Sequence, residues 1–398
     1  MKALYGLPQA NYIAYHGLKD HLATEGFHET TTKCHFRHVS KDISFIVNVD
    51  DFLFKIKSVE DGEYSINMLE KKWKIKAKRN YINNELPQVY KFKYTGITIE
   101  HDRNKRYIDL SLPDYYALLR SSIPDHIKPR HTPGNPTPIN YGQQVQAIEE
   151  DEKYELNDAD IHELQKLVGK YGWYAKQVAI DLLPHVSILS THQTKPNKNT
   201  KPSMEAVQGY LKMWGDHKLR YYASDMILHI MADASHGTEI TKEGKHRSRD
   251  AYYAYLGTKD PTYINAPISV HTRIITGIPA SAAEAEINSN FNSGKVGLYM
   301  RQMLDDMGYK QSTTIIFTDN ICAKYYANDT IKGIKLRHIA RKHEWIKHMV
   351  NTKTFTLKYI PPIDNLADFF TKIMNKQRHD YLTSFIVHRK KMLSMKIT

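Results

Sequence analysis

The order of strand-like and helix-like segments after Met226 limits the folds open to this chain more than any other feature. Three apolar runs with turn residues between them come first, which is the pattern of hairpin-linked strands. Further strands then alternate with helical segments, and such an alternation predicts one mixed sheet with helices packed on it. The expected strands are 227–232, 250–256, 268–274, 313–318 and 355–360, and the expected helices are 281–307, 321–328, 338–350 and a segment from Asn365.

Proline, glycine and charge divide the rest of the chain. Residues 131–140 hold three prolines and one glycine, and residues 149–163 hold eight acids against one lysine, so this stretch is interpreted as a linker. Apolar residues keep helical spacing on both sides of the polar stretch 195–203. We therefore expect a mixed α/β chain with four parts: 1–130, a linker and helical region 131–224, a sheet domain 225–375, and a basic tail 376–398 that forms a mobile arm.

Composition narrows the class of partner. Lys and Arg number 56 against 43 Asp and Glu, a net charge of +13, which favours a polyanion such as nucleic acid. The two cysteines, Cys34 and Cys322, have neither disulfide-framework nor zinc spacing, so a reducing compartment is expected. No apolar run approaches the roughly 18 residues of a membrane span, and no membrane partner is expected.

Four acids stand where the predicted strands end or the predicted helices begin. Three or four carboxylates can hold two divalent ions about 4 Å apart, and such a pair can activate water and stabilise the leaving oxygen in phosphodiester hydrolysis. Oxygen ligands suit magnesium. A single acid at a strand end is usually solvated surface, so the prediction rests on the ordered set Asp233, Glu286, Asp319 and Asp368.

Five blocks carry a family resemblance. They are ADAS at 232–235, SAAEAE at 281–286, TDN at 318–320, RHI at 337–339 and NLADFFTK at 365–372. In order and spacing they resemble the ribonuclease H domain of copia-type retrotransposon Pol polyproteins. Upstream, ALYGLPQA at 3–10, NVDD at 48–51 and YTGI at 94–97 are similar to the reverse transcriptase of the same polyproteins.

The resemblance implies a ribonuclease H-like five-stranded mixed sheet after a partial reverse transcriptase palm and thumb (1–130) and a helical connection. It implies that Asp233, Glu286, Asp319 and Asp368 bind two Mg²⁺ or Mn²⁺ ions and hydrolyse the RNA strand of an RNA/DNA hybrid. Other Pol or Gag products are further implied partners, and the implied location is the cytoplasm, in virus-like particles, or the nucleus.

The same resemblance gives the polymerase region a partial metal site at Asp50 and Asp51. The family takes another metal-binding Asp from a strand before the LYG block, and this sequence begins inside that block. We therefore expect polymerase activity to be lost. Two alternatives remain open: a nucleic-acid-binding remnant without catalysis, or a subunit of a retroelement polymerase.

Two features of the glutamate-bearing helix bear on the site. Glu284 competes with Glu286, two positions away and on a different helix face; the family pattern favours Glu286, which precedes the first large side chain, Ile287. Residues 288–297 are rich in Asn, Ser and Gly, weak helix formers, and predict poor local order.

Basic side chains supply candidate nucleic-acid contacts. In 71–79 lysines alternate with Trp73, Ile75 and Ala77; the lysine face either follows phosphates or protects a solvated sheet edge. In the helix near 338, Arg337 and Lys342 could meet a hybrid duplex, although charged helix faces are usually only solvated. The candidate residues are Lys72, Lys74, Lys76, Lys78, Arg337 and Lys342.

Overall fold

The computed structural model describes residues 8–79, 81, 84–134, 157–196, 199–240, 246–261, 263–320 and 337–388. The expected mixed α/β class is confirmed. The chain forms two compact units, Met1–Ile108 with Tyr299–Lys310, and Asp109–Leu298 with Gln311–Thr398. Within the described ranges, no helix is both long and apolar enough to cross a membrane. The helix expected at 321–328 lies outside the described residues.

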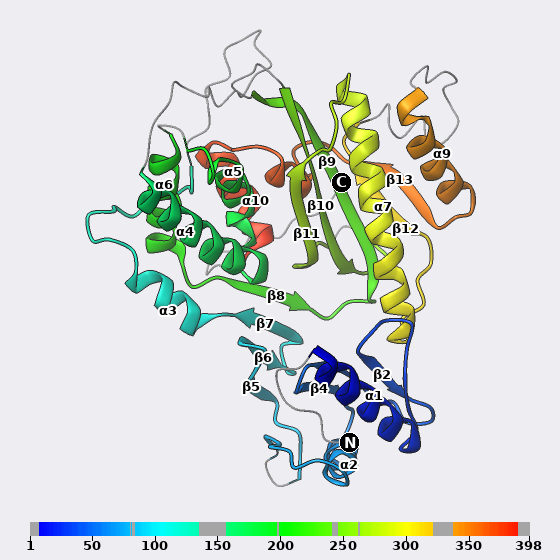
Figure 1. Cartoon of the computed structure of the whole chain (residues 1–398). Coiled ribbons are helices and arrows are strands. Elements are labelled where there is room, and N and C mark those ends of the chain that lie inside the picture. The colour runs from blue at the N-terminus through cyan, green and yellow to red at the C-terminus, as the bar shows by residue number, and fades with distance from the viewer. Residues whose placement is uncertain are drawn as a thin grey trace. The chain divides into compact units, whose positions relative to one another are not determined.

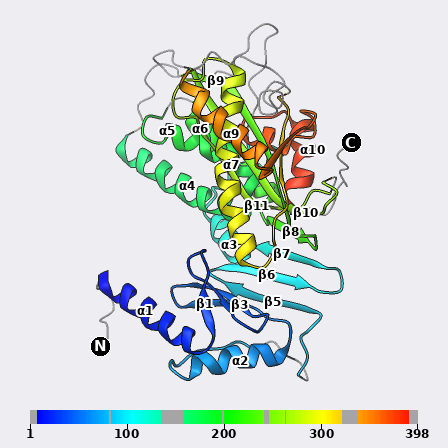
Figure 2. The same cartoon turned by 90° about the vertical axis from the view of Figure 1, so that its right-hand side faces the viewer.

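The first unit is built on an antiparallel sheet of order β1-β2-β3-β4, beside which α2 runs (Figure 2). Leu22, Phe27, Phe36, Phe45 and Met68 form its core, so both long helices contribute side chains to the sheet's apolar face. A separate hairpin pairs β5 with β6. The elements are α1 (Pro8–Thr24), β1 (Phe27–Glu29), β2 (His35–His38), β3 (Ser44–Asn48), β4 (Asp51–Lys55), α2 (Val59–Glu70), β5 (Val89–Tyr94) and β6 (Ile97–Asp102).

The second unit contains most of the predicted sheet domain and the helical region before it. Of the elements given next, the first two residues of β7 (107–108) and the last eight of α7 (299–306) belong to the first unit. Its elements are β7 (Tyr107–Ser111), α3 (Pro113–Ser121), α4 (Asp158–Gln177), η1 (Ile180–Leu182), α5 (Leu183–His192), α6 (Thr200–Trp214), β8 (Lys218–Tyr222), β9 (Ile227–Ile240), β10 (His246–Gly257), β11 (Pro267–Ile274), α7 (Ala282–Asp306), β12 (Thr314–Thr318), α9 (Arg337–Asn351), β13 (Phe355–Tyr359), η2 (Leu366–Phe370) and α10 (Lys376–Ile386). The boundaries of the four expected parts of the chain remain predictions.

The central sheet has the order β11-β10-β9-β12-β13. The first three strands in sequence pair antiparallel as hairpins, whereas β12 runs parallel to both β9 and β13. Parallel neighbours need a crossover, and α7 and α9 precede β12 and β13 in the chain as such connections. The mixed sheet predicted from the order of segments is therefore confirmed.

Helices cover both faces of this sheet (Figure 1). Successive residues on β10 point to opposite faces. Arg249 donates to Ser187 of α5, while Asp250 accepts from Asn292 of α7. The two neighbours thus mark the α5 face and the α7 face. Asp233 on β9 and Asp319, directly after β12, belong to the sheet layer between these faces.

Helix α7 is continuous across the stretch for which poor order was expected, and that expectation is wrong. A Cβ on Gly297 would lie 2.8 Å from Ile230 Cδ1, and one on Gly294 would lie 2.9 Å from Trp345. Ser289 Oγ donates to the carbonyl oxygens of Asp233 and Ala251 on the sheet. The small and polar residues allow close approach to the sheet and bind it, which offsets their weak helix propensity.

The expected mobile arm is also wrong for residues 376–386, which form α10. Asn375 caps the helix by accepting from Arg378 N. Leu382 and Ile386, four residues apart, are buried on its inner side. The apolar spacing, rather than the basic charge, decides how this segment folds.

Candidate metal centre

The parallel pairing of β9 and β12 places two of the predicted acids side by side. Met231 and Phe317 are register partners, so Asp233 and Asp319 each follow a paired residue by two positions. Because β12 ends at Thr318, Asp319 is the first residue beyond the strand. The local sequences MADAS and FTDN thus deliver two carboxylates to one edge of the β9–β12 pair.

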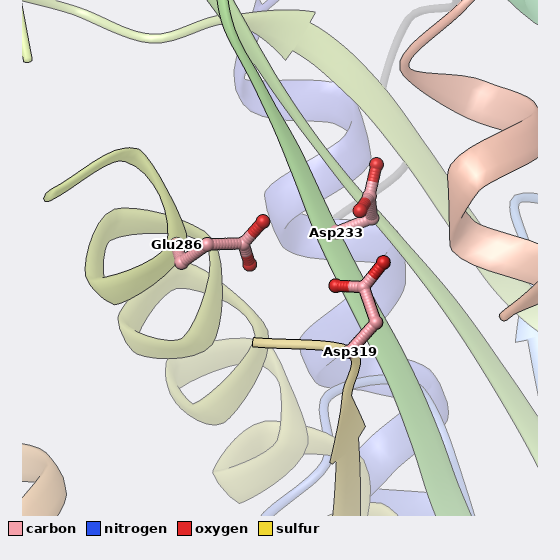
Figure 3. Close-up of side chains that lie close together, drawn as sticks. All are labelled: Asp233, Glu286 and Asp319. Carbon is pink, nitrogen blue, oxygen red and sulfur yellow. The ribbon is translucent and has the colours of Figure 1, made fainter. Parts of the chain in front are cut away.

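Glu286 reaches the same place from α7. Figure 3 shows its side chain extending from the helix toward Asp233 and Asp319. Each of the three residues offers a carboxylate oxygen, and these oxygens lie within 4.8 Å of one another. Glu286 Oε1 also accepts from Ala234 N at 3.3 Å, which fixes the glutamate against β9.

Glu284 has a different role. Its carboxylate accepts from Ala280 N, and its own N–H donates to Ser281 Oγ at 3.3 Å. This reciprocal bonding at the start of α7 is close to a capping box, for which Ser281 and Glu284 have the required spacing. The structure therefore places Glu286, and not Glu284, in the acid group.

Burial and mutual repulsion set the electrostatics of the group. Asp233 is 1% exposed, and burial, with the charges of Asp368 and Asp319, raises its pKa to about 7 despite Lys372. Burial and the two neighbouring aspartates raise the pKa of Glu286 well above its ordinary value. Burial also raises the pKa of Asp319. Without a compensating cation, three charges at this separation are costly.

Asp368 lies next to the group but is not part of it. Its Oδ1 accepts from Lys372, and its Oδ2 lies 3.7 Å from an Arg378 guanidinium nitrogen. Among the described residues, the cluster with metal-ligand spacing holds Asp233, Glu286 and Asp319 alone. Of the four acids predicted to converge, the structure brings three together and pairs the fourth with cations.

The donor set fits a hard divalent cation. All three groups supply carboxylate oxygens, the ligands that Mg²⁺ and Mn²⁺ prefer. Glu286 Oε2 is buried and has no hydrogen-bond partner among the described residues. A buried oxygen of this kind is expensive unless something binds it, and a cation held by the three acids would satisfy it.

Three residues without a predicted role support these acids: Thr371, Ser289 and Lys372. Thr371 donates to Asp233 Oδ2, and Ser289 holds the backbone of the same residue. Lys372 Nζ lies 3.9 Å from Asp233 Oδ2. Thr371 and Lys372 close the NLADFFTK block, so their position in that block was the available signal.

The paired aspartates of the first unit belong to no group of acids with metal-ligand spacing among the described residues. Asp50 and Asp51 are exposed at the turn between β3 and β4, after Val49, which has a φ of 60°. A positive φ is rare for a β-branched residue and marks a strained turn. Among described residues no third acid joins them at metal-ligand distance. Their polymerase role stays a prediction.

The lysine row alternates as predicted, although no strand forms over 71–79. Trp73 and Ile75 pack against the core of the first unit, whereas the intervening lysines are exposed. Lys342 contacts Asn288 on α7, so its ammonium is engaged within the protein. The side chain of Arg337 lies outside the described residues. Nucleic-acid contacts by Lys72, Lys74, Lys76, Lys78, Arg337 and Lys342 remain predictions.

Comparison with known proteins gives relatives over nearly the whole chain. No protein-family model matches. The retrovirus-related Pol polyprotein from transposon RE2 of Arabidopsis thaliana is 24% identical over 384 residues, 94% of this chain and 24% of the polyprotein. The transposon Ty1-ER2 Gag-Pol polyprotein of Saccharomyces cerevisiae is 22% identical over 407 residues, 97% of this chain and 22% of the polyprotein.

Among solved structures, LC11-RNase H1 in complex with an RNA/DNA hybrid covers 35% of this chain and 91% of its own, with 12% identity and a TM-score of 0.26. The chain spans about a quarter of the length of the polyproteins it matches. Over that span, at 22–24% identity along 94–97% of its residues, the chain is a homologue of retrotransposon Pol polyproteins of the copia and Ty1 type.

Proposed function

We propose that the second unit is a metal-dependent nuclease of ribonuclease H type that cleaves the RNA strand of an RNA/DNA hybrid. The observation that carries the proposal is the convergence of Asp233, Glu286 and Asp319 from two strands and one helix. Homology to Pol polyproteins supports a retroelement enzyme. The excess of basic residues supports a nucleic-acid substrate.

In this proposal each residue near the site has a physical task. Asp233, Glu286 and Asp319 would hold the cation, which, when bound, supplies Lewis acidity and a lowered pKa for bound water. Thr371 orients Asp233 by donating to Oδ2. The cap by Glu284 and the bonds of Ser289 fix the start of α7 on the sheet, and so fix Glu286. Preorganised ligands lose little entropy on binding.

The RNA strand would be distinguished by its 2′-hydroxyl and by the A-form shape of the hybrid. Asp368, the fourth acid implied by the family resemblance, is within the electrostatic field of Asp233 and Asp319. We assign it to the outer edge of the metal site.

The test is cleavage of a labelled RNA/DNA hybrid by the purified 398-residue chain in Mg²⁺ or Mn²⁺. Cleavage of the RNA strand, no cleavage of a matched DNA duplex, and loss with chelator are the expected results. Asp319→Asn removes one ligand charge with little change in shape, and Asp216→Asn, at an exposed loop position, is the matched control.

A folded protein that binds hybrid in chelator, but cleaves no faster than the Asp319→Asn variant, would replace this proposal with that of a non-catalytic binding remnant. Circular dichroism on each variant establishes that the comparison is between folded proteins.

A further inference from the structure

A lysine lies among the acids. Lys372 follows η2, donates to Asp368 Oδ1, and lies 3.9 Å from Asp233 Oδ2. It is thus placed between a member of the three-acid cluster and the fourth predicted ligand. Its side chain is 37% exposed.

Both oxygens of Asp368 face cations. Lys372 contacts Oδ1, and Arg378 lies 3.7 Å from Oδ2. A carboxylate that is neutralised on both sides is a poor ligand for a divalent ion, because the incoming charge is repelled by the cations already present. Asp368 can become a ligand only if one of these two side chains leaves.

The two cations differ in how firmly they are held. Arg378 donates to the carbonyl oxygens of Ile363 at 2.5 Å and Pro362 at 2.7 Å, which fix its planar guanidinium. Among the described residues, the ammonium of Lys372 contacts only Asp368 and Asp233. A lysine has a flexible four-carbon stem, so Lys372 is the side chain that can move.

We propose that Lys372 is an internal counter-ion that competes with a divalent cation for the edge between Asp233 and Asp368. One ion binds Asp233, Glu286 and Asp319 with Lys372 in place. A second ion binds at Asp368 only after Lys372 turns to solvent. Lys372 is therefore a positioning residue that sets how many ions the site holds at a given concentration. The inference rests on the proposed function only in taking these acids as metal ligands.

The first test is titration of Mn²⁺ into the whole chain. Binding is measured by calorimetry and by the electron paramagnetic resonance signal of free Mn²⁺. Lys372→Met removes the charge and keeps the length of the side chain. Lys376→Met is the control, because Lys376 pairs with Asp380 at 3.1 Å, away from the cluster. We expect the second ion to bind about tenfold more tightly to Lys372→Met, since a unit charge about 4 Å away acts strongly in a partly buried site.

Lys376→Met and Lys372→Arg should bind both ions as the wild type does. Equal second-ion affinity in Lys372→Met and wild type would overturn the proposal. Loss of the first ion in Lys372→Met would also overturn it, because Lys372 would then hold the cluster together instead of competing with a cation.

The second test uses wild-type protein and therefore does not depend on whether a variant folds. Reductive methylation followed by peptide mass spectrometry reports the access of reagent to each lysine. Labelling of Lys372 should rise at least twofold at saturating Mn²⁺, with Lys376 unchanged. Constant labelling of Lys372 in the presence of the ion would show that it does not move. Neither readout involves cleavage, so an inactive protein that gives these results would refute the nuclease proposal and leave this inference standing.

Discussion

Two groups of acids in this chain have similar composition and opposite surroundings. Asp50 and Asp51 are neighbours in sequence, and both are exposed on one hairpin turn. Asp233, Glu286 and Asp319 are separated by tens of residues, yet they meet in a site where the first two are almost fully buried. The turn between β3 and β4 leaves the adjacent pair in water, where their charges are screened. Convergence through the sheet places them where each charge is felt by the others.

The largest expected difference between the two groups is in catalysis. Asp319→Asn should lower the rate of hybrid cleavage at least about 100-fold, because ligand charge on a metal site contributes several kcal/mol to transition-state stabilisation. Asp50→Asn should leave the rate within about twofold, since the residue is outside the cluster. Single-turnover rates on a labelled hybrid measure both. An equal loss of cleavage rate in Asp319→Asn and Asp50→Asn would show that the two groups of acids do not differ in catalysis.

The next largest expected effect is on how the stability of the metal-free protein, measured in chelator, depends on pH. Because the folded-state pKa of Asp233 is raised from 3.8 to about 7, its favourable contribution is complete below about pH 4 and is lost as pH rises through 7. The contribution of Asp233 to the free energy of unfolding should therefore fall by a few kcal/mol across this range.

Urea denaturation at pH 4 to 8 measures this dependence. Asp319→Asn should reduce the pH-dependent contribution of Asp233, because it removes one repulsive neighbour. Asp51→Asn should leave that contribution unchanged. Saturating Mg²⁺ should restore stability at the upper end of the range, since a ligand that binds only the folded state stabilises it. Profiles in chelator that coincide for Asp319→Asn and the wild type would contradict the assignment of repulsion to this cluster.

A smaller effect tests how the buried group is positioned. Gly297→Val should destabilise the protein by about 1 to 3 kcal/mol, because the added atoms meet Ile230 and Phe355 where α7 approaches the sheet. Gly169→Val on α4 is the control, as a Cβ there meets nothing within 4 Å. Chemical denaturation of both variants gives the comparison. Similar stability in the two would mean that α7 can move away from the sheet without cost.

The smallest effect concerns the cap of α7. Ser281→Ala should cost about 1 kcal/mol, the usual value of an N-terminal side-chain cap, because Ser281 Oγ accepts from Glu284 N. Ser121→Ala, at the exposed end of α3, should be close to neutral. Thermal unfolding with Mn²⁺ titration on the same samples separates stability from metal binding. Unchanged stability in Ser281→Ala would contradict the assignment of Ser281 as the cap of α7.

The order of strands and helices was predictable from the sequence, because hairpin turns and alternation of apolar residues are local signals. It also predicted that Asp233 and Asp319, which follow apolar strand runs, and Glu286, through the family pattern, would converge, and these three acids do lie together. Each of these signals lies within a short segment of the chain, and most of the apolar residues of the predicted strands are buried in the structure. The lysine alternation in 71–79 is of the same kind, since each side of an extended segment meets one environment.

Two outcomes were not predictable from local sequence signals, because tertiary contacts override those signals. The Asn, Ser and Gly residues of α7 disfavour a helix locally, but close packing on Ile230 and the bonds of Ser289 to the sheet stabilise it. Likewise Asp368 is adjacent to the other acids, yet Lys372 and Arg378 hold it apart from them. Ile230 is distant from α7 in sequence, whereas Lys372 and Arg378 follow Asp368 by only four and ten positions. In both cases the outcome depends on packing and charge, which act through space, whereas propensity acts along the chain.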